Sequence, residues 1–252
     1  SRCGWNIHGS APRPPAGSLR RGKFSLFEFA GEVVDTTQGD RRGGKKLADY
    51  KSGFTAQSVW IVSQKKFKRN KMDNKILEKL KKIKMLMLDI DGVMTDGGII
   101  MDSEGRESKV FNVRDGHGLV LVQRHGISVS ILTGRTSSVV EHRARDLKIT
   151  EVYQGALNKK EIFGQILHKN NLLPDDVAYA GDDIVDIPVL KMAGFAVAVA
   201  DADEMVKKIA DYVTVNKGGR GAVREICELL LVAQGFWPEV AARYEFTEFA
   251  LK

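Results

Sequence analysis

The chain of 252 residues suffices for one or two domains, and 43% of its residues are hydrophobic, enough for a sizeable core. No apolar run reaches the roughly 18 residues of a membrane-spanning helix, so no membrane segment is predicted. The net charge of +7 is uneven: residues 1–71 hold 15 Lys and Arg against 5 Asp and Glu, whereas residues 72–252 hold 24 against 27. The basic excess therefore belongs to the first 71 residues and gives no reason to expect nucleic-acid binding by the remainder.

The two cysteines, Cys3 and Cys227, lie far apart in the sequence and lack the spacing of a metal site. Two such cysteines give no disulfide framework, which favours a reducing compartment such as the cytoplasm. The histidines after residue 72 also lack metal spacing and are interpreted as structural or surface residues.

Residues 1–71 show no sustained period of a strand or a helix, and a helical pattern begins only at Met72. We expect residues 1–71 to be a disordered or non-native extension, from an over-extended reading frame or an addition made for expression. Residues 72–252 are then the folded domain. A targeting peptide is an alternative, although five acidic residues speak against it. A nucleic-acid-binding arm is a third interpretation.

Strands and helices alternate after Ile83. The predicted strands are 83–88, 127–132, 151–153, 177–180, 195–199 and 212–215. The predicted helices are 116–125, 137–147, 159–170, 184–192, 204–209 and 222–233, the last of which closes the chain. Residues 97–113 are predicted to form a hairpin, with strands at 98–101 and 109–111 around a turn at 102–105. This order predicts an α/β fold with a parallel sheet and helices on both faces.

Residues capable of chemistry follow four of the predicted strands. They are Asp89 and Asp91, Thr133-Gly134-Arg135, Lys159, and Gly181-Asp182-Asp183. Each group alone has a plain explanation, such as a helix start or a turn. The carboxyl ends of parallel strands share one edge of a sheet, however, so one crevice is expected to hold all four groups.

These residue types suit phosphoryl transfer. The carboxylate of Asp89 can accept a phosphoryl group as an acyl phosphate, and Mg²⁺ prefers oxygen ligands such as those of Asp89 and Asp182. Thr133 can hold the phosphoryl oxygens and Lys159 can balance their charge. Asp91 can give a proton to the leaving alcohol and later activate water. The pattern therefore predicts a Mg²⁺-dependent phosphatase.

The same residues resemble the four motifs of the haloacid dehalogenase superfamily of phosphatases. The matching stretches are Leu88–Gly92, Leu132–Gly134, Lys159 (with Lys160 as a competitor) and Gly181–Asp186. The resemblance implies a Rossmann-like core with Asp89 as nucleophile and Asp91 as acid and base. It also implies Mg²⁺ bound by Asp89, the Asp91 carbonyl and Asp182, with Asp183 as a supporting carboxylate.

Longer stretches resemble the 3-deoxy-D-manno-octulosonate 8-phosphate phosphatase family, over about residues 83–235. They are residues 111–116, 133–135, 153–155 and 218–225. The resemblance implies hydrolysis of that sugar-acid phosphate in lipopolysaccharide precursor biosynthesis. It also implies a capless fold with a hairpin flap, and a homotetramer whose neighbouring subunits close each site. The substrate contacts that it implies are Asp91, Asn112, Val113, Arg114, Asp115, Gly116, Arg135, Arg143 and Lys159.

Two positions and two other functions stay open. Val120 stands where some members of the family have an arginine, which puts one contact to the sugar acid in doubt. Arg220 fits either a substrate contact or a turn. The chain is alternatively a phosphatase for another sugar acid, such as a nine-carbon 9-phosphate, or a non-catalytic assembly module. The intact set of catalytic residue types argues against the module.

Overall fold

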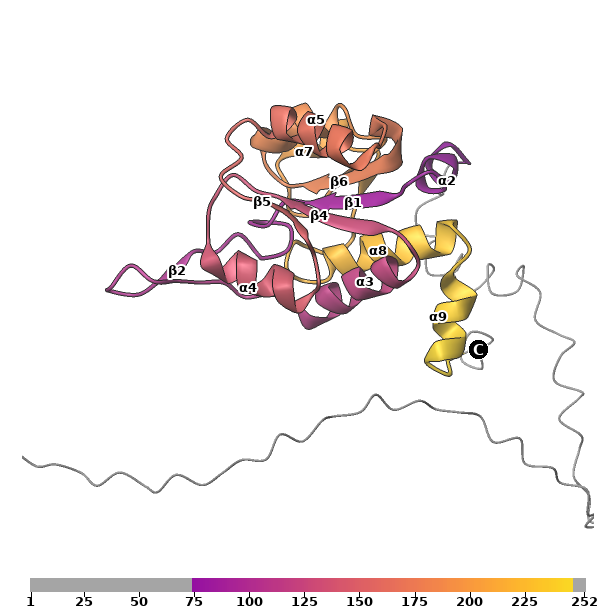
Figure 1. Ribbon diagram of the computed structural model, residues 1–252, viewed down its shortest axis with the longest axis horizontal. Coiled ribbons are helices and arrows are strands. Elements are labelled where there is room, and N and C mark those ends of the chain that lie inside the picture. Colours follow the sequence, from indigo (N-terminus) through magenta and orange to yellow (C-terminus); the bar gives the residue numbers. More distant parts are fainter. Residues whose placement is uncertain (1–73, 247–252) are drawn as a thin grey trace, which may run out of the picture. The chain divides into compact units, whose positions relative to one another are not determined.

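The structure is a computed structural model that describes residues 74–246, so the predicted extension over residues 1–71 lies outside the described residues (Figure 1). Six parallel strands form the main sheet, in the order β5-β4-β1-β6-β7-β8. The strands are β1 Met85–Leu88, β4 Ser128–Leu132, β5 Glu151–Tyr153, β6 Val177–Gly181, β7 Phe195–Ala198 and β8 Tyr212–Val213. The chain runs from β1 to one edge and then crosses to β6 on the other side of β1. Open α/β sheets bind ligands at such a reversal.

Helices cover both faces of this sheet, as predicted (Figure 1). The helices on one face are α3 Val113–Arg124, α4 Ser138–Asp146 and α8 Ala222–Ala233; on the other lie α5 Lys159–Asn170 and α7 Glu204–Ile209. Strand β1 is buried at all four positions, which explains its uninterrupted apolar sequence. Helix α2 Asn74–Leu80 precedes it. Within the described range, no helix combines the length and the apolar character needed to cross a membrane.

Several boundaries differ from the prediction. Helix α3 begins at Val113, three residues before the expected Gly116, because the Asn112 side chain caps it by accepting from the Arg114 and Asp115 amides at 2.8 and 3.3 Å. The helix expected over 184–192 is instead the 3₁₀ turn η3 Ile184–Asp186 followed by α6 Ile187–Leu190. Pro188 explains the change, since it has no N–H to give to the Ile184 carbonyl.

The expectation that the helix over 222–233 closes the chain is wrong. A further helix, α9 Trp237–Arg243, follows it. Gly235, at φ +81°, ends the preceding segment, and Pro238 in the first turn suits a new helix start.

The predicted hairpin is present, between β1 and α3. Its strands are β2 Ile100–Met101 and β3 Glu107–Ser108, paired antiparallel. The second strand lies earlier than the predicted 109–111, because the Asp102 amide donates to the Arg106 carbonyl and closes the turn there. In Figure 1 the hairpin extends away from the sheet at the β2 label.

Candidate active site

Three strand ends meet at the predicted edge of the sheet. Leu88 at the end of β1 pairs with Ile131 of β4 and with Ala180 of β6. Asp89, Thr133 and Asp182 therefore follow neighbouring strands at the same edge. The Asp89 amide continues the pairing by donating to the Ala180 carbonyl at 3.1 Å.

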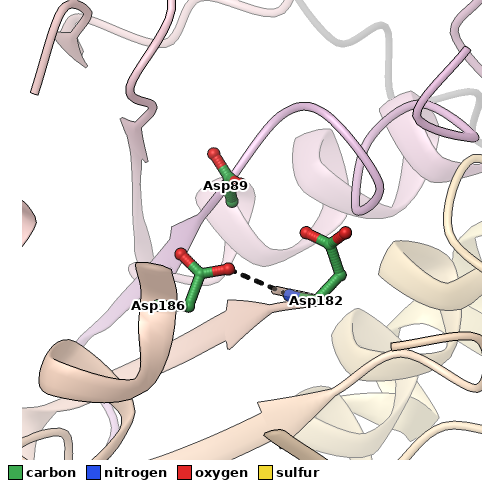
Figure 2. A group of neighbouring side chains, drawn as sticks. All are labelled: Asp89, Asp182 and Asp186. Atoms are coloured by element: carbon green, nitrogen blue, oxygen red, sulfur yellow. Dashed lines mark hydrogen bonds between the residues drawn. The ribbon is translucent and has the colours of Figure 1, made fainter. Parts of the chain in front are cut away.

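Three carboxylates converge there, as Figure 2 shows for Asp89, Asp182 and Asp186. One oxygen of each lies within 4.8 Å of the others. The Oδ1 atoms of Asp89 and Asp182 are buried and accept no hydrogen bond from the described residues. The Lys159 ammonium lies 3.0 Å from Asp89 Oδ1 as an ion pair, without the alignment of a hydrogen bond. Buried anionic oxygens without donors are unfavourable, so these two atoms fit a bound cation.

The electrostatics of this cluster support the same interpretation. Burial raises the pKa of Asp89 to about 6; the Lys159 charge opposes this rise and the Asp186 charge adds to it. Burial, followed by the charges of Asp89 and Asp186, raises the pKa of Asp182 to about 8. A divalent cation between Asp89 and Asp182 would stabilise both ionised forms. Their carboxylate oxygens are the ligands that Mg²⁺ prefers.

Asp186, to which the sequence analysis gave no role, is fully buried and satisfied. Its Oδ1 accepts from the Tyr179 hydroxyl at 2.6 Å and from Lys159 Nζ at 2.7 Å. Its Oδ2 accepts from the amides of Asp182 and Asp183 at 3.0 and 3.3 Å. Asp186 therefore orients Lys159 and the backbone that carries Asp182. The available signal was its place four residues after Asp182, where one turn brings its side chain back to the strand end.

Lys159 is the first residue of α5, whose cap is Asn158. Its side chain is 4% exposed and lies between Asp89 and Asp186. Burial alone would lower the pKa of Lys159, but the charges of Asp89 and Asp186 outweigh it and raise the pKa above its usual value. Lys160 is exposed, so the structure places Lys159 and not its neighbour beside Asp89.

Glycines allow the loop after Asp91 to approach its neighbours closely. Gly92 has φ +93°, and a Cβ there would lie 1.9 Å from Asp182 Oδ2. On the other side, a Cβ at Gly218 would lie 1.6 Å from the Gly92 carbonyl oxygen. The Gly219 amide donates to the Val93 carbonyl at 2.9 Å. Position 92 therefore admits only glycine without a shift of Asp182.

Asp91 is surrounded by charges that the sequence analysis only partly foresaw. The Lys109 ammonium contacts Asp91 Oδ1, and Arg135 Nε lies 3.6 Å from Asp91 Oδ2. Glu107 contacts both cations, at 3.3 Å from Lys109 and 2.7 Å from Arg135. Glu107 and Lys109 were missed. Their spacing of two residues, which places side chains on one side of an extended segment, was the signal.

The predicted substrate residues at the start of α3 have different environments. Val113 and Arg114 are exposed. Asn112 uses its oxygen to cap α3, and its Nδ2 donates to the Gly219 carbonyl at 3.4 Å. The carboxylate of Asp115 is buried and caps α8, accepting from the amides of Arg224 at 2.7 Å and Gly221 at 3.2 Å. The Asp115 side chain thus serves the packing of α3 against α8.

Arg143 packs against the same helix start. Its guanidinium lies 5.6 Å from the centroid of the Phe111 ring, and a Cβ at Gly116 would lie 2.2 Å from Arg143 Nη2. Arg143 Nη1 pairs with Asp146 at 2.7 Å, while its buried Nε has no hydrogen-bond partner among the described residues. Gly116 therefore provides the space that Arg143 occupies.

Two further residues lie outside the carboxylate cluster. Asp183 is exposed, and its Oδ1 accepts from the Ile184 amide at 2.7 Å, which caps η3. Arg220 pairs with Asp96 at 2.9 Å, both side chains being well exposed. Asp183 thus supports the turn that positions Asp182. Arg220 joins the glycine-rich loop over residues 218–221 to Asp96, which precedes the hairpin.

Comparisons with known proteins agree with the family resemblance found in the sequence. Residues 131–226 match the haloacid dehalogenase-like hydrolase family. The chain is 49% identical over 160 residues to the 3-deoxy-D-manno-octulosonate 8-phosphate phosphatase KdsC of Escherichia coli K12, covering 64% of this chain and 85% of that protein.

Solved structures with this fold carry the same enzyme name. One is the phosphatase of Moraxella catarrhalis in complex with magnesium ion, phosphate ion and KDO, with 40% identity and a TM-score of 0.66, covering 68% of this chain and 98% of that one. Another is the phosphatase of Yersinia pestis, with 45% identity and a TM-score of 0.64, covering 65% and 88%.

Proposed function

The chain belongs to the 3-deoxy-D-manno-octulosonate 8-phosphate phosphatase family, and on this premise we propose that it hydrolyses that phosphate to 3-deoxy-D-manno-octulosonate and inorganic phosphate. The reaction is the hydrolysis of a phosphoric monoester, in the supply of lipopolysaccharide precursors. The observation that carries the proposal is the pair of Asp89 and Asp182, each with a buried Oδ1 that accepts no hydrogen bond from the described residues, and with Lys159 3.0 Å from Asp89.

The enzyme is Mg²⁺-dependent, and the buried Oδ1 atoms of Asp89 and Asp182, which accept no hydrogen bond from the described residues, fit that ion. We assign its ligands as these two carboxylates and the Asp91 carbonyl, with Asp183 supporting the turn behind Asp182. When bound, the ion supplies positive charge to the transferring phosphoryl group and neutralises the carboxylates.

The first half of the reaction is phosphoryl transfer to the enzyme. A carboxylate oxygen of Asp89 attacks phosphorus, and the bond between phosphorus and the sugar oxygen breaks. Asp91 gives its proton to that leaving oxygen, so the free sugar acid departs as an alcohol. Lys159 balances the charge on Asp89 and on the phosphoryl oxygens, and Thr133 with neighbouring amides holds those oxygens.

The second half is hydrolysis of the aspartyl-phosphate. Asp91, now ionised, takes a proton from water as the water oxygen attacks phosphorus. The bond between phosphorus and the Asp89 oxygen breaks, which releases inorganic phosphate and restores both carboxyl groups. Positioning and charge neutralisation are the main demands of this chemistry, and the buried side chains of Asp89, Thr133 and Lys159 are placed to meet them.

Arginines suit the carboxylate of the sugar acid. Arg114 is exposed at the start of α3, the Arg135 side chain is 47% exposed beside Asp91, and Arg143 packs against Gly116. A guanidinium fork matches a carboxylate with two parallel hydrogen bonds. We assign these three arginines, with the α3 start around Asn112, to recognition of the sugar acid.

We further propose a cytoplasmic homotetramer in which neighbouring subunits close each site. The hairpin carries three exposed apolar residues, Ile99, Ile100 and Met101. A two-stranded hairpin is marginally stable alone, and pairing across a symmetry axis would bury these side chains and exclude water from the site. Two cysteines far apart in the sequence give no disulfide framework, which supports a reducing compartment.

Phosphate release by the purified full chain tests the proposal. The panel holds an eight-carbon sugar-acid 8-phosphate, a nine-carbon sugar-acid 9-phosphate and neutral sugar phosphates, with Mg²⁺ or EDTA. We expect the highest kcat/KM on the eight-carbon substrate, only with Mg²⁺, and a loss of about three orders of magnitude or more in the Asp89→Asn control. Preference for the nine-carbon substrate would favour the alternative sugar acid. Preference for neutral sugars, or no turnover with Mg²⁺, would contradict the proposal.

A further inference from the structure

Lys109 follows the hairpin directly and turns its side chain inward. That side chain is 1% exposed, although the next residue, Val110, is 59% exposed. A buried ammonium is strongly unfavourable unless anions pair with it. Its two anionic partners are Asp91 and Glu107, so the chain places a desolvated cation directly on the residue assigned as acid and base.

The contacts form a closed network of alternating charge. Asp91 Oδ1 meets Lys109, and Asp91 Oδ2 faces Arg135 Nε at 3.6 Å. Glu107 meets the same two cations from the other side, at 3.3 and 2.7 Å. A hydrogen bond from the Ser137 hydroxyl, followed by those from the two cations, lowers the pKa of Glu107 and keeps it ionised. Both oxygens of Asp91 therefore face a cation that is itself held in place.

The hairpin has a second anchor besides the contact between Lys109 and Asp91. Glu107 already joins β3 to the loop after β4 through Arg135, at 2.7 Å. Lys109 adds a contact to one specific carboxylate oxygen in the site. Proton transfer depends steeply on the position of the donor, so a fixed Asp91 carboxylate is a catalytic requirement.

We propose that Lys109, with Glu107 as its counter-ion, is a positioning residue that holds the Asp91 carboxyl group in place, both when it gives its proton to the sugar leaving group and when, ionised, it takes one from water. The inference rests on the proposed function, because it uses Asp91 as the acid and base. It makes the hairpin part of the catalytic apparatus of its own subunit, in addition to its place in subunit contacts.

The dependence on leaving group separates this role from a structural one. A sugar alkoxide needs the proton from Asp91, whereas p-nitrophenolate leaves without one. For Lys109→Met in the full chain the first half is followed alone, as the rate at which the sugar or p-nitrophenolate is released in a single turnover, because hydrolysis of the aspartyl-phosphate uses Asp91 with either substrate. We expect this rate to fall about 10- to 100-fold on the sugar-acid phosphate, a share of what general acid catalysis contributes, against less than about threefold on p-nitrophenyl phosphate. Lys109→Arg keeps the charge and should recover part of the loss.

The matched control is Lys169→Met, which removes a lysine that is also ion-paired, to Glu151 at 2.9 Å, away from Asp91. This variant should leave the rate on both substrates unchanged. Glu107→Gln should repeat the leaving-group pattern more weakly, and the double variant should lose no more than Lys109→Met alone, because both act through Asp91.

Asp91→Asn, measured in parallel, separates the inference about Lys109 from the assignment of Asp91. If Asp91→Asn is selective for the sugar substrate but Lys109→Met slows both substrates equally or neither, the inference about Lys109 is overturned and the proposed function stands. If Asp91→Asn itself shows no selectivity in this single-turnover rate, the assignment of Asp91 as the acid fails and the inference fails with it. Equal activity of Lys109→Met and Lys109→Arg would also overturn it, since the charge would then have no role.

Discussion

Lys159 and Asp186 form an ion pair of 2.7 Å whose side chains are only 4% and 0% exposed. The same ammonium lies 3.0 Å from Asp89. Asp186 has no free oxygen, because Tyr179 and two backbone amides also donate to it. Asp186 therefore positions Lys159 beside Asp89, the proposed nucleophile. Asp186 itself is not among the residues assigned to the chemistry.

Removing Asp186 should affect stability and catalysis together. Asp186→Ala takes one of the two carboxylates from Lys159, which keeps Asp89 and the Tyr179 hydroxyl, and it deprives that hydroxyl of its acceptor. Breaking a buried pair in this way costs about 3–5 kcal/mol. We expect a loss of that size in the free energy of unfolding by urea, together with a large fall in kcat.

The control for this change is Asp175→Ala, which removes an exposed carboxylate just before the start of β6, at the opposite end of the strand from Asp182. It should change stability by less than about 0.5 kcal/mol. An Asp186→Ala protein as stable as this control would show that Lys159 finds another partner and that Asp186 does not fix it.

Metal-free protein should lose stability as the pH rises. Asp182 has a pKa of about 8 in the folded chain against an ordinary value of 3.8, so between these values the folded state holds a proton that the unfolded state has released. The free energy of unfolding then falls with rising pH across this window. Asp89, with a pKa of about 6, contributes in the same direction at its lower end.

Bound Mg²⁺ replaces those protons, so its stabilising effect should grow with pH. We expect the rise in Tm on adding Mg²⁺ to EDTA-treated protein to be larger at pH 8 than at pH 6. Taking the difference with and without Mg²⁺ at each pH cancels the titration of distant groups. In Asp182→Asn the rise in Tm on adding Mg²⁺ should be small at both pH values. An equal rise at pH 6 and 8 in the unaltered chain would contradict the assignment.

The sequence predicted the sheet and its reactive edge because those features are local or follow from topology. Asp89, Thr133 and Asp182 each follow an apolar strand, and parallel strands end at one edge. The features that the sequence did not predict depend on contacts between residues far apart in the chain. Lys109 contacts Asp91, and Glu107 contacts Arg135, only because the chain after the hairpin turn returns toward the sheet. Asp115 points into the junction of α3 and α8, which no local pattern encodes.

Arg114 should matter for the sugar acid and not for a simple phosphate. Its side chain is exposed at the start of α3 and free to meet a substrate carboxylate. For Arg114→Ala we expect a higher KM on the sugar-acid phosphate, a loss of about 1.5–3 kcal/mol, the scale of a hydrogen bond to a charged group. The KM for p-nitrophenyl phosphate should stay unchanged. Arg145→Ala, an exposed arginine on α4, is the control. Equal losses on both substrates would assign Arg114 to the phosphate or the fold.

A protein trimmed to residues 72–252 should retain full activity. The charge pattern changes at this boundary, and the described fold begins soon after it with α2, whose Leu80 is buried in the core. The trimmed protein should unfold cooperatively and match the full chain in kcat/KM. Loss of either property would show that residues 1–71 contribute to the fold or the site.

The hairpin should decide the oligomeric state. Ile99, Ile100 and Met101 are 56%, 52% and 58% exposed on a segment with two residues in each strand. Such a segment has few hydrogen bonds of its own, so a neighbouring copy is the natural partner for its apolar side chains. Sedimentation velocity of the full chain at assay concentration should show a tetramer.

Ile100→Asp places a charge in that contact and should shift the protein to smaller species with lower activity, since each site then loses the neighbour that closes it. Leu173→Asp changes another exposed apolar residue, 68% exposed and outside the hairpin, and should leave the tetramer intact. The activity of Ile100→Asp should rise with protein concentration as residual association returns. A fully active monomer, from either the unaltered chain or Ile100→Asp, would mean that one subunit completes its own site.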